Sequence, residues 1–329
     1  MDRARVILGI FLSILTLASL ASVITVSYAD HGDFRGDFSK MAKATSVSVE
    51  EFVLIPKEPK RLEPVFVFVK IRGVIDSIPK LKVNGTIMVI GPAGNVHLSW
   101  QFGPRYLPMV PVSDGWYVSA IPGLPARSDY NTIIISRVNY CVIMEGSVHG
   151  CGGYEVVPEW PSLNASPVVF ISVYEVINNT RLFRETLGLG PSGWRADAGE
   201  QVKVLIVALD DKKLENVCFE YSVSGNAWMS APTYRDRLMD EYIGLIEELN
   251  SIFSDINNLG IGESLPEPSL PIEIRYANVP GQALGNYVMF RANAGDPDGK
   301  ATKSPMGFYY VVDCSLSLIH ISEPTRLGM

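Results

Sequence analysis

The sequence has few of the residues that carry out chemistry, and it has no excess of positive charge. Histidine occurs four times in 329 residues, and none of the four lies in an HExxH motif. Walker, GxGxxG, GxSxG and CxxC motifs are also missing from any suitable context, so we predict no catalytic residues and no cofactor, and whether the chain is an enzyme stays open. Lysine and arginine number 28 against 35 acidic residues, and the net charge of −7 argues against a nucleic-acid partner.

Charged residues make up only 19% of the chain, whereas hydrophobic residues make up 47%. This balance allows a sizeable core and excludes a wholly disordered chain. At the usual ~100–200 residues for each domain, the length predicts about two domains.

The longest uncharged stretch lies at the N-terminus, where Arg3 and Arg5 precede a run without charge from Val6 to Ala29. A positive start, an apolar core and a final Ser-Tyr-Ala are typical of a secretory signal, but the run also has the ~20 residues of a membrane-spanning helix. Residues 1–29 are therefore predicted to be a signal peptide or a membrane anchor, and residues 30–44 a stalk. The remainder is expected to be extracellular or at the cell surface, either secreted or held to the membrane by this N-terminal segment.

The cysteines and glycosylation triplets fit an exported protein. Cys141 and Cys151 flank a short segment with two glycines, which predicts a hairpin closed by a disulfide. Cys218 and Cys314 lie in separate predicted strands, and whether they pair stays open. Three Asn-x-Ser/Thr triplets are candidate N-glycosylation sites, at Asn84, Asn164 and Asn178.

Most of the chain after the stalk has the pattern of β-strands. Short β-branched and aromatic runs alternate with turn residues every ~8–12 positions, and Asn84-Gly85 is one strong turn signal among them. A Pro-rich break at residues 158–167 predicts a linker, and residues 181–200 have the pattern of a loop. We predict a mainly β fold of two β-sandwiches, at 45–158 and 159–315, rather than alternating β/α units.

An internal repeat relates the two predicted sandwiches. Ile121-Pro122-Gly123 precedes Tyr130 and a β-rich run, just as Val279-Pro280-Gly281 precedes Tyr287 and a second such run. In each copy a glycine-containing loop and a closing strand follow, which predicts tandem copies of one supersecondary plan.

Five successive segments of the later copy resemble the strands of an immunoglobulin-like or fibronectin type III-like domain: EQVKVLIVALDD, LENVCFEYSVSGNAW, IRYANVPG, NYVMFRANAGDPDG and SPMGFYYVV. In those domains a Trp-bearing hairpin precedes a Pro-Gly turn, a Tyr-initiated strand and a final strand. The first copy, with DGWYVSAIPGLPARSDY, resembles the same plan more loosely. The resemblance implies a fold rather than an activity, because such domains serve as adhesion modules, surface-layer units, spacers or appendages of exported enzymes.

One segment of the second sandwich, residues 234–258, departs from the β pattern. Its apolar residues recur at three- and four-residue steps, at Leu238, Tyr242, Leu245, Leu249, Ile252 and Ile256. That spacing predicts an amphipathic helix of about five or six turns, inserted in the second sandwich. We expect the insertion to pack on the sandwich; the alternatives are a partner-binding helix and the first helix of a separate domain.

Two binding signals are weak. Asn293, Asp296 and Asp298 form a loop with the oxygen ligands that Ca²⁺ prefers, although the spacing is that of an ordinary Asp-Gly turn rather than an EF-hand. Trp116 and Trp228 are candidates for stacking against a glycan, although core packing is the commoner fate of aromatic residues in a sandwich.

The C-terminal residues 316–326 read LSLIHISEPTR, which resembles translated sequencing adapter. Residues 316–329 are therefore expected to be an artefact of a truncated reading frame rather than native sequence.

These observations predict an exported, membrane-tethered surface protein of two immunoglobulin-like domains. Its expected role is adhesion, envelope structure or presentation, with a protein or glycan partner at the surface. One alternative is a truncated exported hydrolase such as a zinc peptidase, whose HExxH helix would follow the final strand. A further alternative is a glycan-binding module.

Overall fold

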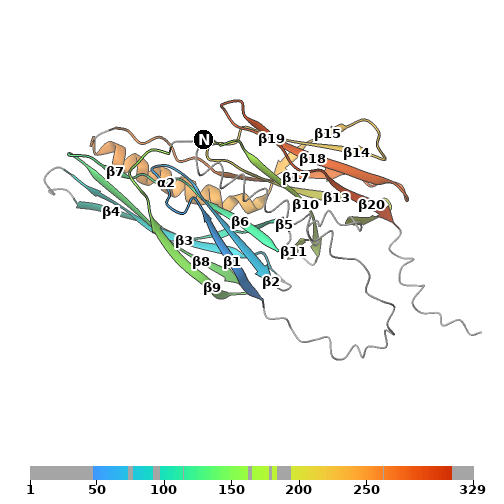
Figure 1. The fold of residues 1–329 in the computed structure, drawn as a ribbon, viewed down its shortest axis with the longest axis horizontal. Coiled ribbons are helices and arrows are strands. Elements are labelled where there is room, and N and C mark those ends of the chain that lie inside the picture. Colours follow the sequence, from blue (N-terminus) through green and yellow to red (C-terminus); the bar gives the residue numbers. More distant parts are fainter. Residues whose placement is uncertain are drawn as a thin grey trace, which may run out of the picture.

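The described residues fold into two β-sandwich-like units placed end to end, with one long helix beside the first (Figure 1). The computed structural model describes residues 47–72, 77–91, 97–113, 115–161, 165–177, 180–183, 194–261 and 263–312. None of the helices in these ranges combines the length and the apolar character that crossing a bilayer requires. The leader predicted at 1–29, the stalk predicted at 30–44 and the suspected adapter at 316–329 lie outside the described residues.

The first unit contains β1 (Ser48–Ile55), β2 (Val65–Arg72), β3 (Lys80–Ile90), β4 (His97–Pro108), β5 (Val110–Ser113), β6 (Trp116–Ile121), β7 (Arg127–Ser128), β8 (Ile133–Met144) and β9 (Ser147–Glu155). One sheet has the strand order β1-β2-β6-β5. The other has the order β4-β3-β8-β7, and β9 also pairs with β8. Neighbouring strands pair antiparallel in both sheets.

The second unit contains β10 (Val168–Ile177), β11 (Thr180–Phe183), β12 (Trp194–Asp197), β13 (Val202–Leu209), β14 (Asn216–Val223), β15 (Met229–Ala231), β16 (Thr233–Arg235), β17 (Ile272–Val279), β18 (Tyr287–Gly295), β19 (Ala301–Lys303) and β20 (Gly307–Val312). Its sheets have the orders β11-β10-β13-β17-β16 and β12-β20-β18-β14-β15, with β19 paired to β18. The loop predicted at 181–200 is partly wrong, because β12 lies within it and its backbone pairs in parallel with β20.

The sheets of the two units have the same strand order. The sheet order β10-β13-β17-β16 repeats β1-β2-β6-β5, and β15-β14-β18-β20 repeats β4-β3-β8-β9. The pairing register agrees as well, since Val65 of β2 lies opposite Ile121 of β6 and Val202 of β13 lies opposite Val279 of β17.

The repeated Pro-Gly sequence has the same structural role in both units. A Cβ atom at Gly123 would lie 2.1 Å from the carbonyl oxygen of Leu62, and one at Gly281 would lie 2.1 Å from that of Gly199. Leu62 and Gly199 both have a positive φ, of 60° and 79°. Each donates its N–H to the carbonyl of the residue after the paired glycine, at 2.8 and 2.9 Å. The glycine is therefore kept in both copies because the backbone of a neighbouring turn passes directly against it.

The turn predicted at Asn84-Gly85 is wrong. Strand β3 continues through these residues, with a bulge in its pairing to β4 between Val83 and Gly85. A Cβ atom at Gly85 would lie 2.4 Å from both the Arg137 carbonyl oxygen and the Phe102 ring. The glycine signals close packing inside the sheet rather than a reversal of the chain.

The buried apolar side chains of the described residues form two hydrophobic clusters. One lies inside the second unit, and the other fills the first unit and extends to the junction between them. Residues of β13 alternate between these clusters. Leu205, Val207 and Leu209 belong to the cluster of the first unit, whereas Val204, Ile206 and Ala208 belong to the cluster of the second unit. Because both faces of β13 are buried, its sequence is an almost unbroken apolar run instead of an alternating one.

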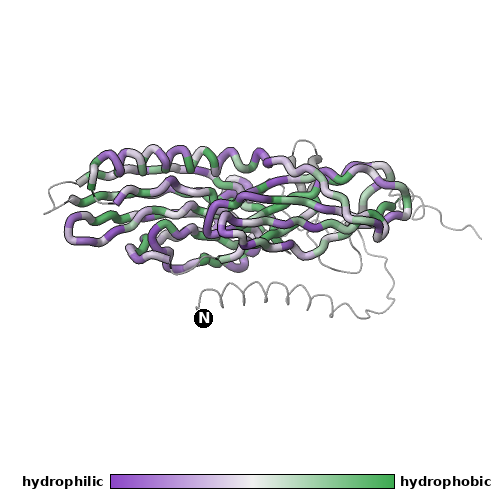
Figure 2. The backbone as a smooth tube through the Cα atoms, turned by 90° about the horizontal axis from the view of Figure 1, so that it is seen from above, coloured by the Kyte–Doolittle hydropathy of each residue, from purple (hydrophilic) through white to green (hydrophobic). Residues whose placement is uncertain are grey.

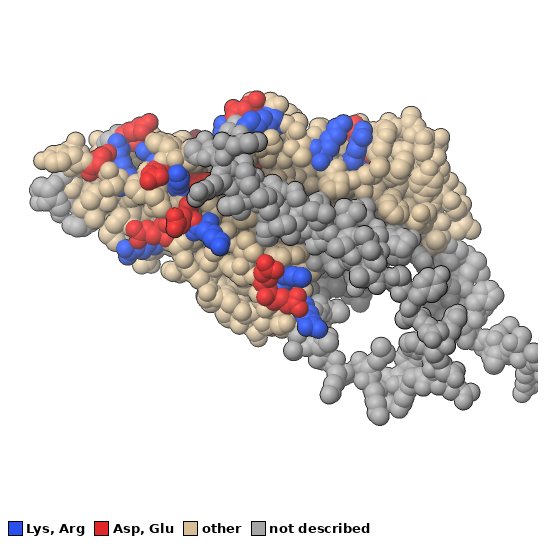
Figure 3. Space-filling view, in the orientation of Figure 1, with Lys and Arg blue, Asp and Glu red and all other residues tan. Residues whose placement is uncertain are grey.

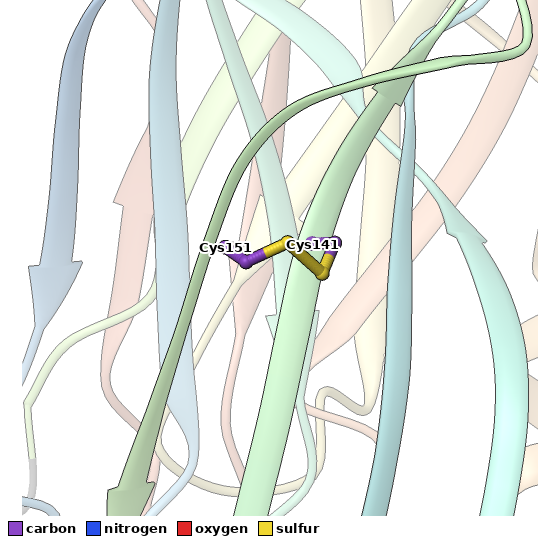
Figure 4. Close-up of a disulfide and its surroundings, with 2 residues drawn as sticks. All are labelled: Cys141 and Cys151. Atoms are coloured by element: carbon purple, nitrogen blue, oxygen red, sulfur yellow. A yellow bond between two sulfur atoms is a disulfide. The ribbon is translucent and has the colours of Figure 1, made fainter.

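Cys141 and Cys151 lie opposite each other on β8 and β9 and are joined by a disulfide (Figure 4). Replacing both with serine is expected to lower the free energy of unfolding by about 2–3 kcal/mol, because the bond closes a short loop and restricts the unfolded chain. Urea titration followed by tryptophan fluorescence measures the effect. The matched control is Cys218→Ser, because that thiol is free and exposed. A double variant no less stable than this control would contradict the prediction.

Candidate functional site at the junction of the two units

The helix predicted at 234–258 begins later than expected: residues 234 and 235 belong to β16, a 3₁₀ turn follows at Arg237–Met239, and the α-helix itself, α2, is Asp240–Asn258. The Asp236 carboxylate accepts a hydrogen bond from the Leu238 N–H at 2.9 Å, which fixes the start of the 3₁₀ turn. The insertion separates β16 from β17. In the first unit the equivalent strands, β5 and β6, are separated by only two residues.

The helix belongs to the second unit in sequence but packs against the first. Its buried side chains, Tyr242, Leu245, Leu249, Ile252, Phe253 and Ile256, join the hydrophobic cluster of the first unit. Helix α2 lies along β4, an edge strand of that unit, and its apolar residues follow one side of the coil (Figure 2). The other sheet of the unit ends at β5, the next strand in the chain. The helix therefore covers the side of the first sandwich on which β4 and β5 are the edges.

Polar contacts fix the start of the helix on the first unit. The Tyr242 hydroxyl donates to the Pro108 carbonyl at 2.7 Å and lies 2.8 Å from the Ser119 hydroxyl. Tyr242 is fully buried, and burial raises its pKa well above the ordinary value. A buried phenol with two oxygen partners gives this contact a specific geometry as well as apolar area.

Further contacts fix the rest of the helix. Glu248 accepts hydrogen bonds from the Arg105 side chain and from the Gly103 N–H, both at 3.0 Å. Near the C-terminal end, Asp255 accepts a hydrogen bond from the Trp100 indole at 3.2 Å. The helix is thus held to β4 over most of its length.

A group of carboxylates lies where the loops of the second unit approach the linker. Asp210 and Asp211 directly follow β13, and Asp296 directly follows β18. The loop after β13 returns beside β18, since the Glu215 N–H donates to the Gly295 carbonyl at 3.0 Å. The two loops are also joined by an ion pair between Lys212 and Asp298.

Each of these carboxylates uses one oxygen to hold backbone and leaves the other without a donor. Asp210 accepts from the Asp211 N–H at 2.9 Å, Asp211 from the Ala165 N–H at 2.9 Å, and Asp296 from the Lys300 N–H at 2.8 Å. The second oxygen of each is buried and has no hydrogen-bond partner when all three groups are ionised; a proton on Asp210 provides a side-chain hydrogen bond to Asp211. Asp210 and Asp296 are only 3% and 5% exposed. Such unpaired buried carboxylate oxygens are costly, because burial removes water without replacing it.

The carboxyl group of Asp210 is coupled electrostatically to its acidic neighbours. Burial raises the pKa of Asp210 to about 8, and a side-chain hydrogen bond with Asp211 and the charges of Asp211 and Asp296 add to this effect. Burial also raises the pKa of Glu63 in the first unit, and Asp211 adds to that effect.

The loop predicted as a weak Ca²⁺ site contributes only part of this group. Asp296 belongs to it, whereas Asp298 lies at the surface in its ion pair with Lys212. Asn293 lies within β18, opposite Lys303 of β19. In the part of the chain that the structure describes, no group of three or more His, Cys, Asp or Glu side chains is placed so that it could hold a metal ion. Asp210 and Asp211 were not among the site residues predicted from the sequence.

The two tryptophans proposed for glycan stacking differ in their surroundings. Trp116 is half-buried and packs against the first hydrophobic cluster. Trp228 is 36% exposed, and the Arg291 guanidinium lies 4.1 Å from its ring centroid. Of these two tryptophans, Trp228 is therefore the one with a ring exposed to solvent, and the Arg291 guanidinium covers one face of that ring.

The remaining predicted sites are scattered. Asn84 is exposed in the middle of β3, whereas Asn164 and Asn178 lie outside the described residues. Cys218 is a free, exposed thiol on β14, and Cys314 also lies outside the described residues. On the face shown in Figure 3, charged side chains of both signs lie together in small groups between wide uncharged areas.

The comparisons with known proteins add no family. No model of a known protein family matches the chain. No curated protein matches it in sequence. Among solved structures, the crystal structure of red sea bream transglutaminase is similar at 8% identity and a TM-score of 0.19, over 77% of this chain and 30% of that one. The chain thus spans under a third of that protein, and a similarity at this level supports no inference about activity.

Proposed function

We propose that this chain is an exported, membrane-tethered surface protein in which two immunoglobulin-like domains form a stiff spacer. Its role would be adhesion, envelope structure or the presentation of another binding part. The observation that carries the proposal is the position of α2, which belongs to the second unit but completes the hydrophobic cluster of the first.

The strand order supports the immunoglobulin-like assignment. In such sandwiches, strands A-B-E-D form one sheet and strands C′-C-F-G form the other. The order β1-β2-β6-β5 corresponds to A-B-E-D, and β4-β3-β8-β9 corresponds to C′-C-F-G. The second unit repeats this correspondence. Fibronectin type III-like domains share the sandwich architecture, so the same strands are compatible with that related plan.

The junction supports the role of a spacer. Domains in one chain move relative to each other by default unless a large apolar interface joins them. Here α2 and one face of β13 bury apolar side chains against the first unit, and Glu248 and Tyr242 add specific polar contacts. We therefore expect one fixed orientation of the two domains.

Distance measurements between spin labels test this stiffness. One label is placed on the native Cys218 and the other on Ser147→Cys, with Cys314 changed to serine; both labelled positions are exposed. A single narrow distance distribution is expected, and the double variant Leu245→Ala/Leu249→Ala should broaden it. A broad distribution in the chain with an intact helix would refute the spacer role.

Export is tested separately by labelling intact cells that produce the full chain. A membrane-impermeant amine reagent should modify exposed lysines such as Lys213 without lysis. A cytoplasmic protein in the same cells is the control for leakage. Modification only after lysis would refute the proposed location.

Glycan binding is a second candidate, favoured by the outer face of β18 and β20. Tyr287 lies opposite Tyr310 on these strands, and the side chains are 37% and 45% exposed. By strand alternation Arg291, which stacks on Trp228, lies on the same face as Tyr287. Exposed aromatic rings of this kind suit sugar stacking.

Retention on polysaccharide columns tests the glycan candidate. Tyr310→Ala and Trp228→Ala should each reduce retention about fivefold or more if their rings stack on sugar, since aromatic contacts contribute about 1 kcal/mol or more each. Trp160→Ala is the matched control, because Trp160 is 54% exposed and lies near the linker, away from this face. No retention of the unaltered chain on a broad panel would argue against the candidate.

A further inference from the structure

We propose that the outer face of β20, β18, β14 and β15 is the interface of a weak homodimer, in which two copies of this chain pack sheet against sheet. The inference goes beyond the spacer role and does not depend on export. It starts from large apolar side chains that gather on one face of the second unit. Tyr287, Tyr310, Trp228 and Met306 are all exposed, Met306 to 51%.

The pairing register places these side chains on one side of the sheet. On β18 and β20, Tyr287 lies opposite Tyr310, and Met289 lies opposite Phe308. Phe290, the next residue of β18, points the other way and is fully buried in the second hydrophobic cluster. The Phe308 ring packs edge-on against the Tyr310 ring, with 5.7 Å between the centroids. The outward residues of these two strands therefore form one continuous apolar strip.

An ion pair lies beside this strip. Arg291 of β18 pairs with Glu220 of β14 at 2.8 Å, and the Arg291 guanidinium stacks on the Trp228 ring. The two charges neutralise each other within one copy. Two such faces can therefore meet without like-charge repulsion from this pair, although the chain as a whole carries a net charge of −7.

The composition of the face favours a protein partner over a sugar. The cores of protein interfaces are enriched in Tyr, Trp, Phe, Met and Arg, and all five types occur on this face. Sugar hydroxyl groups need hydrogen-bond partners, and Met289, Met306 and Phe308 offer almost none. A second copy brings the same apolar strip and the same neutral pair, so a twofold arrangement would match like with like.

The size of the face suits a weak dimer. Four strands spaced ~4.8 Å apart, each contributing about six residues at ~3.4 Å, give a face of about 20 Å by 20 Å. Two copies would then bury on the order of 1,000 Å² in total, which is at the lower limit for a specific interface. A Kd on the order of 10 µM is therefore expected.

Sedimentation equilibrium of the full chain over about 1–100 µM measures this Kd. Tyr310→Lys should raise the Kd at least about tenfold, because each copy would bring an unpaired charge into the interface. Met306→Lys is the second variant and should act in the same way; it lies outside the strands, so it tests the face even if the strand variant folds poorly. Tyr130→Lys is the matched control, because Tyr130 is 99% exposed in the first unit, and it should leave the Kd unchanged.

Cross-linking locates the contact. The free, exposed thiol of Cys218 lies on β14 beside the apolar strip, opposite Asn293 of β18. With Cys314 changed to serine, a short bis-maleimide should join two copies through Cys218, and Tyr310→Lys should abolish the product. A chain that carries Cys218→Ser and Ser147→Cys instead has its exposed thiol on β9 of the first unit and should give little product.

Three results would overturn the proposal. The first is a chain that stays monomeric up to about 100 µM. If that monomer were also retained on polysaccharide through Tyr310, the face would bind glycan rather than a second copy. The second is an unchanged Kd in both lysine variants, and the third is equal cross-linking through Cys218 and through Ser147→Cys; either would place the contact elsewhere.

Discussion

The variant Leu249→Ala is expected to lower the free energy of unfolding of the whole molecule by about 2–5 kcal/mol, because it leaves a cavity in a fully packed core. Leu249 is fully buried within the hydrophobic cluster of the first unit. The helix is covalently part of the second unit, so its loss from the interface should destabilise both. Urea denaturation, followed by tryptophan fluorescence and by circular dichroism, measures the effect.

The control for this variant is Leu259→Ala. Leu259 directly follows the helix and is 38% exposed, so its truncation should change stability by no more than about 0.5 kcal/mol. If Leu249→Ala removes helical signal while the first unit keeps its original midpoint, the helix is not part of that unit's core, and the structural interpretation fails.

The variants Gly281→Ala and Gly123→Ala are each expected to cost about 3 kcal/mol, since one added methyl group would meet a backbone carbonyl that has little room to move. At both positions the Cβ atom would lie 2.1 Å from an oxygen atom. Neither glycine has a positive φ, so the cost comes from the contact rather than from backbone strain. Equal effects at both sites would support the structural equivalence of the two units.

Gly150→Ala is the matched control for these substitutions. Nothing lies within 4 Å of the added Cβ atom there, and the φ angle is ordinary. Alanine should be tolerated or slightly stabilising, because it reduces the freedom of the unfolded chain. If the Gly281→Ala and Gly150→Ala variants had the same free energy of unfolding, the close contact between Gly281 and the Gly199 carbonyl would be refuted.

The mainly β character, the repeat and the long helix could be predicted because each depends on local periodicity. The apolar spacing from Leu238 to Ile256 indicates a helix whatever it packs against. Glycine was harder to interpret. At Gly85 it marks close packing by Phe102 from another strand, which the neighbouring residues do not reveal.

The partner of the helix could not be predicted, because periodicity identifies a buried face without identifying what covers it. The sequence of β13 does indicate that a second partner covers this strand, because its apolar run is too continuous for a sheet with one solvated face. The carboxylate group was missed for a similar reason. Asp210 and Asp296 are 86 positions apart, and their proximity depends on β13 and β18 ending at the same end of the sandwich.

The position of α2 also has a consequence for how the chain is made. The first unit ends its last strand at Glu155, but the helix that covers its open side ends at Asn258. At ~5–20 residues per second, the ribosome delivers that helix on the order of 5–20 seconds after the strands it covers. During this interval the nascent N-terminal unit exposes the apolar side chains along β4 and β5. The first unit can therefore complete its hydrophobic core only after the following domain has been synthesised. Premature release of the nascent chain at the linker would yield a fragment that is prone to aggregation.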